Sequence, residues 1–177
     1  MIYTPREDSY LLEKEVKKYS KGKRVLDMGT GSGIQAIAAK YFGAKSVIAC
    51  DIADDAVKQL GLLGIKTIKS DLFSEINGKF DLIVFNPPYL PEDRRENGES
   101  ALATTGGRKG DEIILRFLEQ VKEHLSERGI ILLLVSSLTP KDRIKPAMKE
   151  KGFNKKVITS EKVFFETLEV WEIKVGD

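Results

Sequence analysis

The segment Asn86-Pro87-Pro88-Tyr89 combines residue types that can hold and orient a planar amino group. Proline lacks an amide hydrogen and has a fixed φ, so the carbonyl of Pro87 can be held as a directed hydrogen-bond acceptor. The side-chain carbonyl of Asn86 is a second acceptor, and Tyr89 offers a flat face for a planar amide or base. Two such acceptors favour a pyramidal nitrogen whose lone pair points at an electrophile. We therefore predict Asn86, Pro87 and Tyr89 as catalytic residues, and Pro88 and Tyr89 as substrate contacts.

A glycine-rich turn within Val25–Gly33 is the second segment with evident binding chemistry. Glycines at alternate positions let the backbone turn sharply and approach a ligand closely. Their spacing differs from the G-x-G-x-x-G fingerprint of dinucleotide-binding folds. The acid before them, Asp27, would repel a phosphate and suits a ligand with an ammonium group. Asp51 and Asp71 end the next two predicted strands, where they can accept hydrogen bonds from ribose hydroxyls and an adenine amine.

An adenosine with a positively charged amino-acid tail suits this set of carboxylates. The predicted cofactor is therefore S-adenosyl-L-methionine, and an NAD-binding domain is the main alternative. The predicted cofactor contacts are Asp27, Gly29, Thr30, Gly31, Gly33, Asp51, Ile52, Asp71, Leu72 and Asn86.

Short apolar runs alternate with helical patterns, which is typical of βαβ units around a mostly parallel sheet. A short connection between the last two runs favours an antiparallel pair. The predicted strands are Arg24–Met28, Ser46–Ile52, Lys66–Ser70, Phe80–Phe85, Gly129–Ser136, Lys155–Ser160 and Thr167–Lys174. The predicted helices are Tyr3–Tyr19, begun by Thr4 or Pro5, then Ile34–Tyr41, Asp111–Leu125 and Lys141–Lys151.

Length and composition favour one domain over residues 1–177, with residues 1–20 as a helical segment packed on it. Lys and Arg exceed Asp and Glu by 29 − 27 = 2 charges, so net charge gives no sign of a nucleic-acid partner. One cysteine, Cys50, and one histidine, His124, make a structural zinc site improbable, and we predict no metal. No stretch approaches the roughly 20 apolar residues of a membrane helix, so the expected location is the cytoplasm.

Together these motifs resemble those of class I S-adenosylmethionine-dependent methyltransferases that carry Asn-Pro-Pro-Tyr and methylate amino groups. More narrowly, the segment Tyr3–Leu12 resembles the opening of the HemK-like glutamine N5-methyltransferases of class 1 translation release factors. The resemblance runs to about Lys174 and includes Gly106-Gly107-x-x-Gly110. It implies a Rossmann-like fold with a seven-stranded, mostly parallel sheet, an antiparallel C-terminal edge pair and helices on both faces. It also implies methylation of the glutamine amide in a Gly-Gly-Gln motif.

We expect the chain to lack the separate N-terminal helical domain of the bacterial form, and it is similar to the short archaeal and eukaryotic-type branch. That resemblance implies a class 1 release factor as substrate and a small zinc-binding activator subunit as partner. By this topology the third strand is a sheet edge, and Leu60–Ile68 is unusually apolar for an edge. Exposed apolar edges invite strand addition by another chain. We therefore expect the activator to dock at Leu60–Ile68.

Two other functions remain open from sequence. The same tetrapeptide could hold an exocyclic amine of adenine or guanine in RNA or DNA, although neither a base-recognition domain nor a clear basic groove is evident. A non-catalytic S-adenosylmethionine-binding module is the other alternative, and Asn86 and Pro87 argue against it because binding alone does not need them. Substituting Asn86 by alanine would distinguish an enzyme from this module, because methyl transfer should be lost while cofactor affinity changes little.

Several residues receive structural interpretations. We expect Cys50, Trp171 and the pair Phe164-Phe165 to fill the core or cover its edge. His124 suits the end of a helix as a structural residue. The basic region Lys141–Lys156 is expected to be a solvated face that could contact RNA.

Two further segments could take part in function. Leu90–Lys109 is a long connection without apolar periodicity, and we predict a functional loop there. Glu7 and Asp8 could cap the first helix or steer substrate, and Glu7 is included among the substrate contacts.

Overall fold

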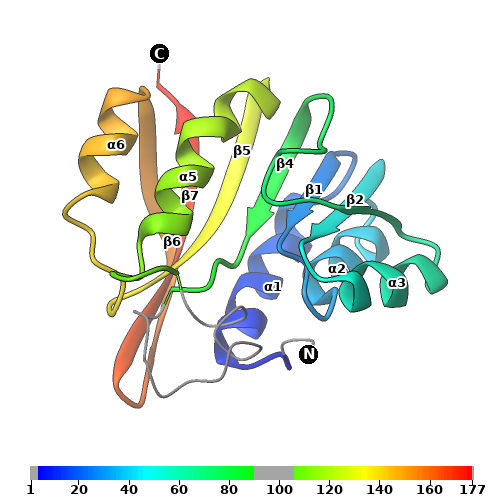
Figure 1. Ribbon diagram of the computed structural model, residues 1–177, viewed down its shortest axis with the longest axis horizontal. Coiled ribbons are helices and arrows are strands. Elements are labelled where there is room, and N and C mark those ends of the chain that lie inside the picture. The colour runs from blue at the N-terminus through cyan, green and yellow to red at the C-terminus, as the bar shows by residue number, and fades with distance from the viewer. Residues whose placement is uncertain (1–3, 90–105, 177) are drawn as a thin grey trace.

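The computed structural model of the protein describes residues 4–89 and 106–176, which form a seven-stranded sheet with helices on both faces (Figure 1). The strand order is β3-β2-β1-β4-β5-β7-β6. The strands are β1 (Arg24–Met28), β2 (Ser46–Asp51), β3 (Lys66–Lys69), β4 (Phe80–Phe85), β5 (Leu125–Ser136), β6 (Phe153–Val163) and β7 (Glu166–Val175). The first five pair in parallel, whereas β7 is antiparallel to both neighbours. The predicted fold class is confirmed.

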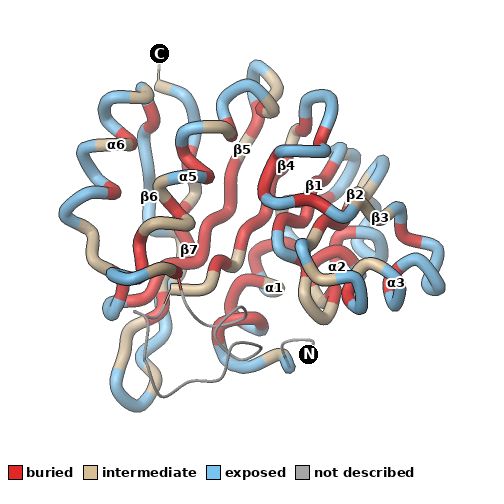
Figure 2. Tube along the Cα trace, viewed as in Figure 1, coloured by how far each residue is buried: buried red, intermediate tan, exposed pale blue. Residues whose placement is uncertain are grey.

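The helices divide between the two faces because the central strands are apolar on both sides. The α-helices are α1 (Glu7–Tyr19), α2 (Ile34–Tyr41), α3 (Asp54–Leu62), α5 (Glu112–Gln120) and α6 (Ile144–Glu150). On one face, α1 and α2 pack on alternate strand residues, which include Val25, Leu82, Val84, Leu132 and Leu134. On the other, α5 and α6 cover Leu26, Met28, Ile83, Phe85, Ile131 and Leu133. Figure 2 shows β4 and the inner part of β5 buried between these two layers.

Two predicted helix boundaries are wrong. The first helix begins at Glu7, not at Thr4 or Pro5, because Arg6 has extended backbone angles of φ −129° and ψ −166°. The predicted helix that reaches Leu125 ends as an α-helix at Gln120 and continues as the 3-10 helix η1 (Val121–His124). At Leu125 the chain enters β5, where it pairs with Phe80 before a bulge shifts the register.

The β6–β7 hairpin is longer than predicted and is closed by the turn residues Phe164 and Phe165. Their expected place in the core or over its edge is wrong, since they are 95% and 94% exposed. Trp171 and Cys50 are fully buried, as predicted. Within the predicted basic region, Lys155 lies 3.9 Å from the centre of the Trp171 ring.

The sheet edge at β3 differs in detail from the predicted apolar strand. Leu60 is a buried residue of α3 and contacts Ala49 and Ile65 in a small apolar cluster, so it is not part of an edge strand. The exposed apolar side chains are instead Leu62 and Leu63, 89% and 57% exposed, at the end of α3. In the described part of the chain, no helix is long and apolar enough to span a bilayer.

Candidate active site

The glycine-rich turn joins β1 to α2 at the carboxyl edge of the sheet. Gly29, Gly31 and Gly33 have φ values of 60°, 52° and 82°, which are accessible to glycine at little cost. At Gly33 a side chain is also excluded by packing, because a Cβ atom would lie 2.1 Å from Cδ2 of Leu60. The three predicted glycines are therefore required by the backbone path of this turn.

Asp27 stabilises the turn from within. Its Oδ2 atom accepts hydrogen bonds from the Thr30 hydroxyl at 2.5 Å and the Ala36 amide at 3.0 Å. The residue is 2% exposed. Burial raises the pKa of the Asp27 carboxyl to about 7, although the hydrogen bonds from Thr30 and Ala36 oppose the shift. Contact of Asp27 with a ligand ammonium group stays a prediction.

Asp51 lies at the carboxyl end of β2 and turns its carboxylate toward the same edge. Its Oδ2 accepts the Gly31 amide at 2.8 Å and its Oδ1 accepts the Ala53 amide at 2.9 Å. A carboxylate has about four lone-pair sites, so each oxygen retains acceptor capacity. That capacity fits the two hydroxyls of a ribose, as S-adenosylmethionine requires. The neighbouring Ile52 is 53% exposed and offers an apolar surface beside it.

The segment after β3 contains the predicted cofactor contacts Asp71 and Leu72. Asp71 pairs with Arg116 of α5 at 2.8 Å, and about half of each side chain is exposed. Leu72 has a positive φ of 50° and a buried side chain. A contact between Leu72 and a ligand would therefore come from its backbone. The Ser70 hydroxyl donates to the Leu72 carbonyl at 2.7 Å and stabilises this turn. Contact of Asp71 or Leu72 with an adenine remains a prediction.

Asn86 follows β4, the strand beside β1, and its carboxamide contacts a buried acid from the first helix. Its Nδ2 donates to Oδ2 of Asp8 at 2.9 Å. Asp8 is 4% exposed, and its Oδ1 accepts the Ser9 amide at 2.7 Å. Since a carboxylate only accepts hydrogen bonds, Asp8 fixes which end of the Asn86 carboxamide carries the nitrogen.

The opposite end of that carboxamide is an acceptor without a protein donor. Oδ1 of Asn86 is buried and has no hydrogen-bond partner among the described residues. Leaving a buried carbonyl unpaired costs roughly 1–3 kcal/mol. A buried acceptor that is unpaired within the protein is suited to accept a hydrogen bond from a bound ligand.

Tyr89 and Pro88 are held by segments distant in sequence. The Tyr89 hydroxyl donates to Oε1 of Glu166 at 3.4 Å, and Glu166 also accepts the Ser136 hydroxyl. Gly106 passes so close to the motif that a Cβ atom there would lie 2.6 Å from the Pro88 carbonyl oxygen. Most of the predicted loop Leu90–Lys109 lies outside the described residues, which resume at Gly106.

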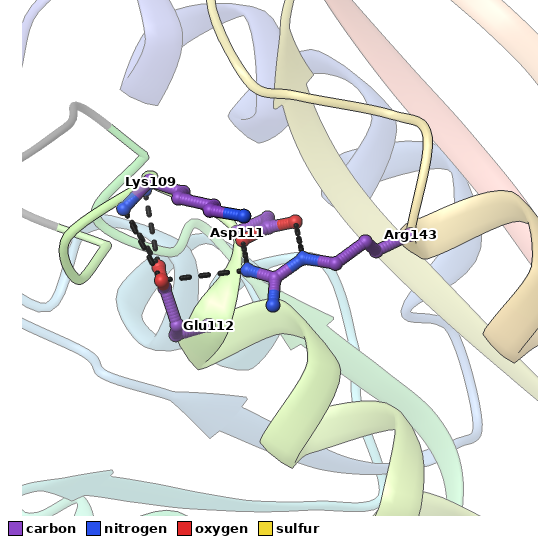
Figure 3. A network of polar contacts seen from close by, with 5 residues as sticks. Lys109, Asp111, Glu112 and Arg143 are labelled. Carbon is purple, nitrogen blue, oxygen red and sulfur yellow. Dashed lines mark hydrogen bonds and ion pairs between the residues drawn. The ribbon is translucent and has the colours of Figure 1, made fainter.

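A polar network holds the segment after Gly106 against the chain that follows β5 (Figure 3). Asp111 is fully buried and its carboxylate accepts two hydrogen bonds from the Arg143 guanidinium. Glu112 accepts the backbone amides of Lys109 and Gly110 at 3.1–3.2 Å. The Ile113 amide donates to the Gly106 carbonyl at 3.2 Å, so the start of α5 is linked to the glycine that lies against Pro88.

The sequence left Asp8 as a helix cap or a residue that steers substrate and did not predict its contact with Asn86, nor that of Glu166 with Tyr89. Glu7, predicted as a substrate contact, is exposed at the first residue of α1, whereas Asp8 turns inward to Asn86. The signal was present in the segment Tyr3–Leu12, but only the packing of α1 against β4 separates the two acids. Glu7 as a substrate contact stays a prediction.

Comparisons with known proteins agree on the class. A model of the ribosomal protein L11 methyltransferase (PrmA) family matches residues 10–61. A Methanocaldococcus jannaschii protein named "Putative protein N5-glutamine methyltransferase MJ0928" is 40% identical over 177 residues, 96% of this chain and 89% of the relative. Methyltransferase HEMK2 of Homo sapiens is 30% identical, with 96% and 87% of the two chains covered.

Solved structures give the same result. The E. cuniculi Mtq2-Trm112 complex, described as responsible for methylation of the eRF1 translation termination factor, matches with a TM-score of 0.80 at 26% identity. The alignment covers 98% of both chains. The ribosomal protein L11 methylase of Lactobacillus delbrueckii subsp. bulgaricus matches with a TM-score of 0.71 at 28% identity, over 99% of this chain and 82% of the other.

The sheet order, the glycine turn and these matches define a class I methyltransferase that uses S-adenosylmethionine as methyl donor. The two relatives aligned over nearly the whole chain narrow the class further. The chain belongs to the HemK-like protein N5-glutamine methyltransferases.

Proposed function

We propose that the protein methylates the side-chain amide nitrogen of the glutamine in the Gly-Gly-Gln motif of a class 1 translation release factor. The observation that carries this proposal is the buried, unpaired Oδ1 of Asn86, oriented by Asp8. The protein N5-glutamine methyltransferase relatives support the glutamine amide as the acceptor. The release factor as substrate is supported by the eRF1 activity stated for the E. cuniculi complex.

The proposed chemistry requires a weak nucleophile to be activated. An amide nitrogen is poorly nucleophilic because its lone pair is delocalised into the carbonyl. Asn86 Oδ1 and the Pro87 carbonyl would accept its two N–H groups and favour a pyramidal nitrogen with a localised lone pair. S-adenosylmethionine supplies an electrophilic sulfonium methyl group when bound. The nitrogen lone pair forms the new N–C bond as the S–C bond breaks, and the nitrogen then releases one proton to solvent.

The remaining predicted residues divide between substrate and cofactor. Tyr89, fixed through Glu166, would pack its ring on the planar amide, with Pro88 and Glu7 along the substrate path. Asp51 would accept the ribose hydroxyls, with Ile52 beside the adenine. The other proposed cofactor contacts are Asp27, Gly29, Thr30, Gly31, Gly33, Asp71, Leu72 and Asn86. We also propose that residues 1–177 act as one catalytic domain, without a bound metal, in the cytoplasm.

The primary test is methyl transfer from labelled S-adenosylmethionine to a class 1 release factor, with ribosomal RNA, transfer RNA and DNA assayed in parallel. Label on the release factor that is lost when its Gly-Gly-Gln glutamine is replaced by asparagine supports the proposal. Asn86→Ala should abolish transfer while the affinity for S-adenosylmethionine changes by less than about threefold. Label on nucleic acid alone would refute the proposal and identify a base methyltransferase. Cofactor binding without transfer to any of these acceptors would favour the non-catalytic alternative.

We further propose that a small zinc-binding activator subunit docks at the β3 edge. Among the described strands, β3 has one neighbour, β2, so its other edge has backbone groups to pair with a strand of another chain. Leu62 and Leu63 add exposed apolar surface at the end of α3, and Ile68 is half-buried in β3. The relation to the methyltransferase subunit of the Mtq2-Trm112 complex supports a small partner.

Charged substitutions test this docking surface. Leu62→Glu with Ile68→Lys should abolish co-purification with the co-expressed activator. Tyr41→Glu is a matched control, because Tyr41 is 84% exposed at the end of α2 and lies outside the proposed interface. Circular dichroism verifies that each variant is folded. Retained co-purification of the folded double variant would rule out this interface.

A further inference from the structure

The tip of the β6–β7 hairpin carries two aromatic side chains that the fold does not use. Phe164 and Phe165, here called the aromatic tip, are 95% and 94% exposed. These are the highest values among the large apolar residues in the described parts of the chain. Neither phenylalanine has a positive φ, so this turn does not need the Asn, Asp or Gly that positive-φ hairpin turns favour. Turn geometry therefore tolerates phenylalanine here without requiring it, and core packing uses neither side chain.

The aromatic tip extends past the edge of the sheet at which the candidate active site lies. Ser136, the last residue of β5, pairs with Leu168, so Phe165 lies three residues further along the hairpin. At about 3.3 Å per residue, the tip extends roughly 10 Å beyond the carboxyl end of β5. Figure 1 shows the hairpin projecting on the side where β4 and β5 end and where α1 begins.

Contacts on both strands hold the hairpin beside the catalytic segment. At the start of β7, Glu166 accepts hydrogen bonds from the Ser136 hydroxyl and from the Tyr89 hydroxyl. On β6, Glu161 forms an ion pair with Lys14 of α1 at 3.7 Å. The aromatic tip directly precedes a residue that contacts the Asn-Pro-Pro-Tyr segment, so a protein reaching Asn86 passes next to it.

We propose that the aromatic tip docks onto an apolar surface of the folded protein substrate while that substrate's glutamine amide occupies the site at Asn86. Paired aromatic side chains on a rigid support are typical anchors of protein interfaces, because they bury large area at low entropic cost. The inference rests on the proposed function and extends it. The aromatic tip recognises the body of the substrate protein, whereas Asn86 and Pro87 recognise the amide.

Local charge favours a protein partner over a lipid surface or a nucleic acid. Among the described residues, the charged side chains next to the tip on the hairpin are Glu161, Lys162 and Glu166, and Glu161 pairs with Lys14 of α1, so these four charges sum to zero. Membrane-surface segments combine their aromatic residues with clustered Lys and Arg that attract anionic lipid. The neutral surroundings of the aromatic tip lack this attraction.

The test compares an intact release factor with a short peptide that contains Gly-Gly-Gln, using the enzyme with its activator. In the double variant Phe164→Ser with Phe165→Ser, KM for the intact factor should rise at least about tenfold with kcat unchanged. Kinetics on the peptide should stay within twofold, because the peptide has no folded surface to dock. Calorimetry of intact-factor binding gives a second readout, with the same loss expected. Tyr41→Ser, an exposed aromatic residue on α2, is the matched control and should match the unmodified enzyme.

Distinct results would overturn the inference. Unchanged KM and unchanged binding of the intact factor in the double variant would show that the aromatic tip does not contact the substrate. An equal loss on factor and peptide would indicate damage to the site itself. Loss of binding to phosphatidylserine vesicles, or loss of self-association in sedimentation, with unchanged KM would assign the tip to a membrane or to a second copy. If the unmodified enzyme methylates neither substrate, the proposed function fails first and this inference fails with it.

Discussion

Asp8→Ala is expected to slow methyl transfer while leaving cofactor binding intact. In the structure, Asp8 accepts the Nδ2 hydrogen of Asn86 at 2.9 Å from a position that is 4% exposed. Alanine removes that acceptor, and the carboxamide can then rotate so that its nitrogen, rather than Oδ1, faces the substrate amide. A donor at that position cannot hold the N–H groups of the nucleophile.

The size of the effect follows from the bond that is lost. A hydrogen bond to a charged group contributes about 1.5–3 kcal/mol, and each 1.4 kcal/mol corresponds to a factor of ten. We therefore expect kcat to fall by roughly 10- to 150-fold. The glycine turn is held by Asp27 and Asp51 through their own hydrogen bonds, so the dissociation constant for S-adenosylmethionine should change by less than about twofold.

The assay is single-turnover methyl transfer, with calorimetry for cofactor affinity and thermal denaturation for folding. Ser9→Ala is the matched control, because it removes only a 3.3 Å hydrogen bond from the Ser9 hydroxyl to the other oxygen of Asp8. That control should reduce kcat by less than about threefold. The reasoning is refuted if Asp8→Ala leaves kcat within threefold of the unmodified enzyme. It is equally refuted if cofactor affinity falls by the same factor as kcat.

Three further predictions concern the turn and its support. The pKa of Asp27 is raised from 3.8 to about 7 in the folded protein. Between these pH values the folded state binds more protons than the unfolded state. The free energy of unfolding should therefore fall as pH rises from about 4 to 7. Asp27→Asn should flatten that slope in denaturation at several pH values, and an unchanged slope would contradict the assignment. Gly33→Ala should lower the free energy of unfolding by about 2–4 kcal/mol in urea denaturation, because Gly33 has φ 82° and a Cβ atom would lie 2.1 Å from Leu60. An unchanged unfolding midpoint would contradict this prediction. Gly106→Ala should displace the Pro88 carbonyl and lower kcat at least about tenfold, with cofactor affinity within twofold; normal turnover would argue against support of the motif by Gly106.

Local patterns predicted most of the fold because they depend on neighbouring residues. The uninterrupted apolar run Ile131–Val135 indicates a strand covered on both faces, and the structure buries every residue of it. The glycines of the turn needed positive φ, which sequence spacing suggests and the backbone confirms. The fold class could therefore be read from periodicity and turn chemistry.

The errors occur where a distant contact overrides the local pattern. The face that includes Phe117, Val121 and Leu125 suits a continuous helix, yet Leu125 pairs with Phe80 in the sheet. The sequence predicted Leu60 as part of an apolar edge strand, but its side chain fills the space beside Gly33. The sequence placed Phe164 and Phe165 in the core or over its edge, but the extension of the hairpin past β5 exposes them.

The site shows the same division between local and distant information. The residue types of the Asn-Pro-Pro-Tyr segment and the acid-glycine turn define two acceptors for an amino group and a nucleoside site, since that chemistry resides in the residues themselves. The sequence alone could not distinguish Glu7 from Asp8, because adjacent helical residues differ only in the direction they face. Tertiary packing decided that Asp8 orients Asn86 and that Glu166 contacts Tyr89, since 78 and 77 residues separate these pairs along the chain. Contacts of that range depend on how α1 and β7 pack against β4 and β5, which no local pattern encodes.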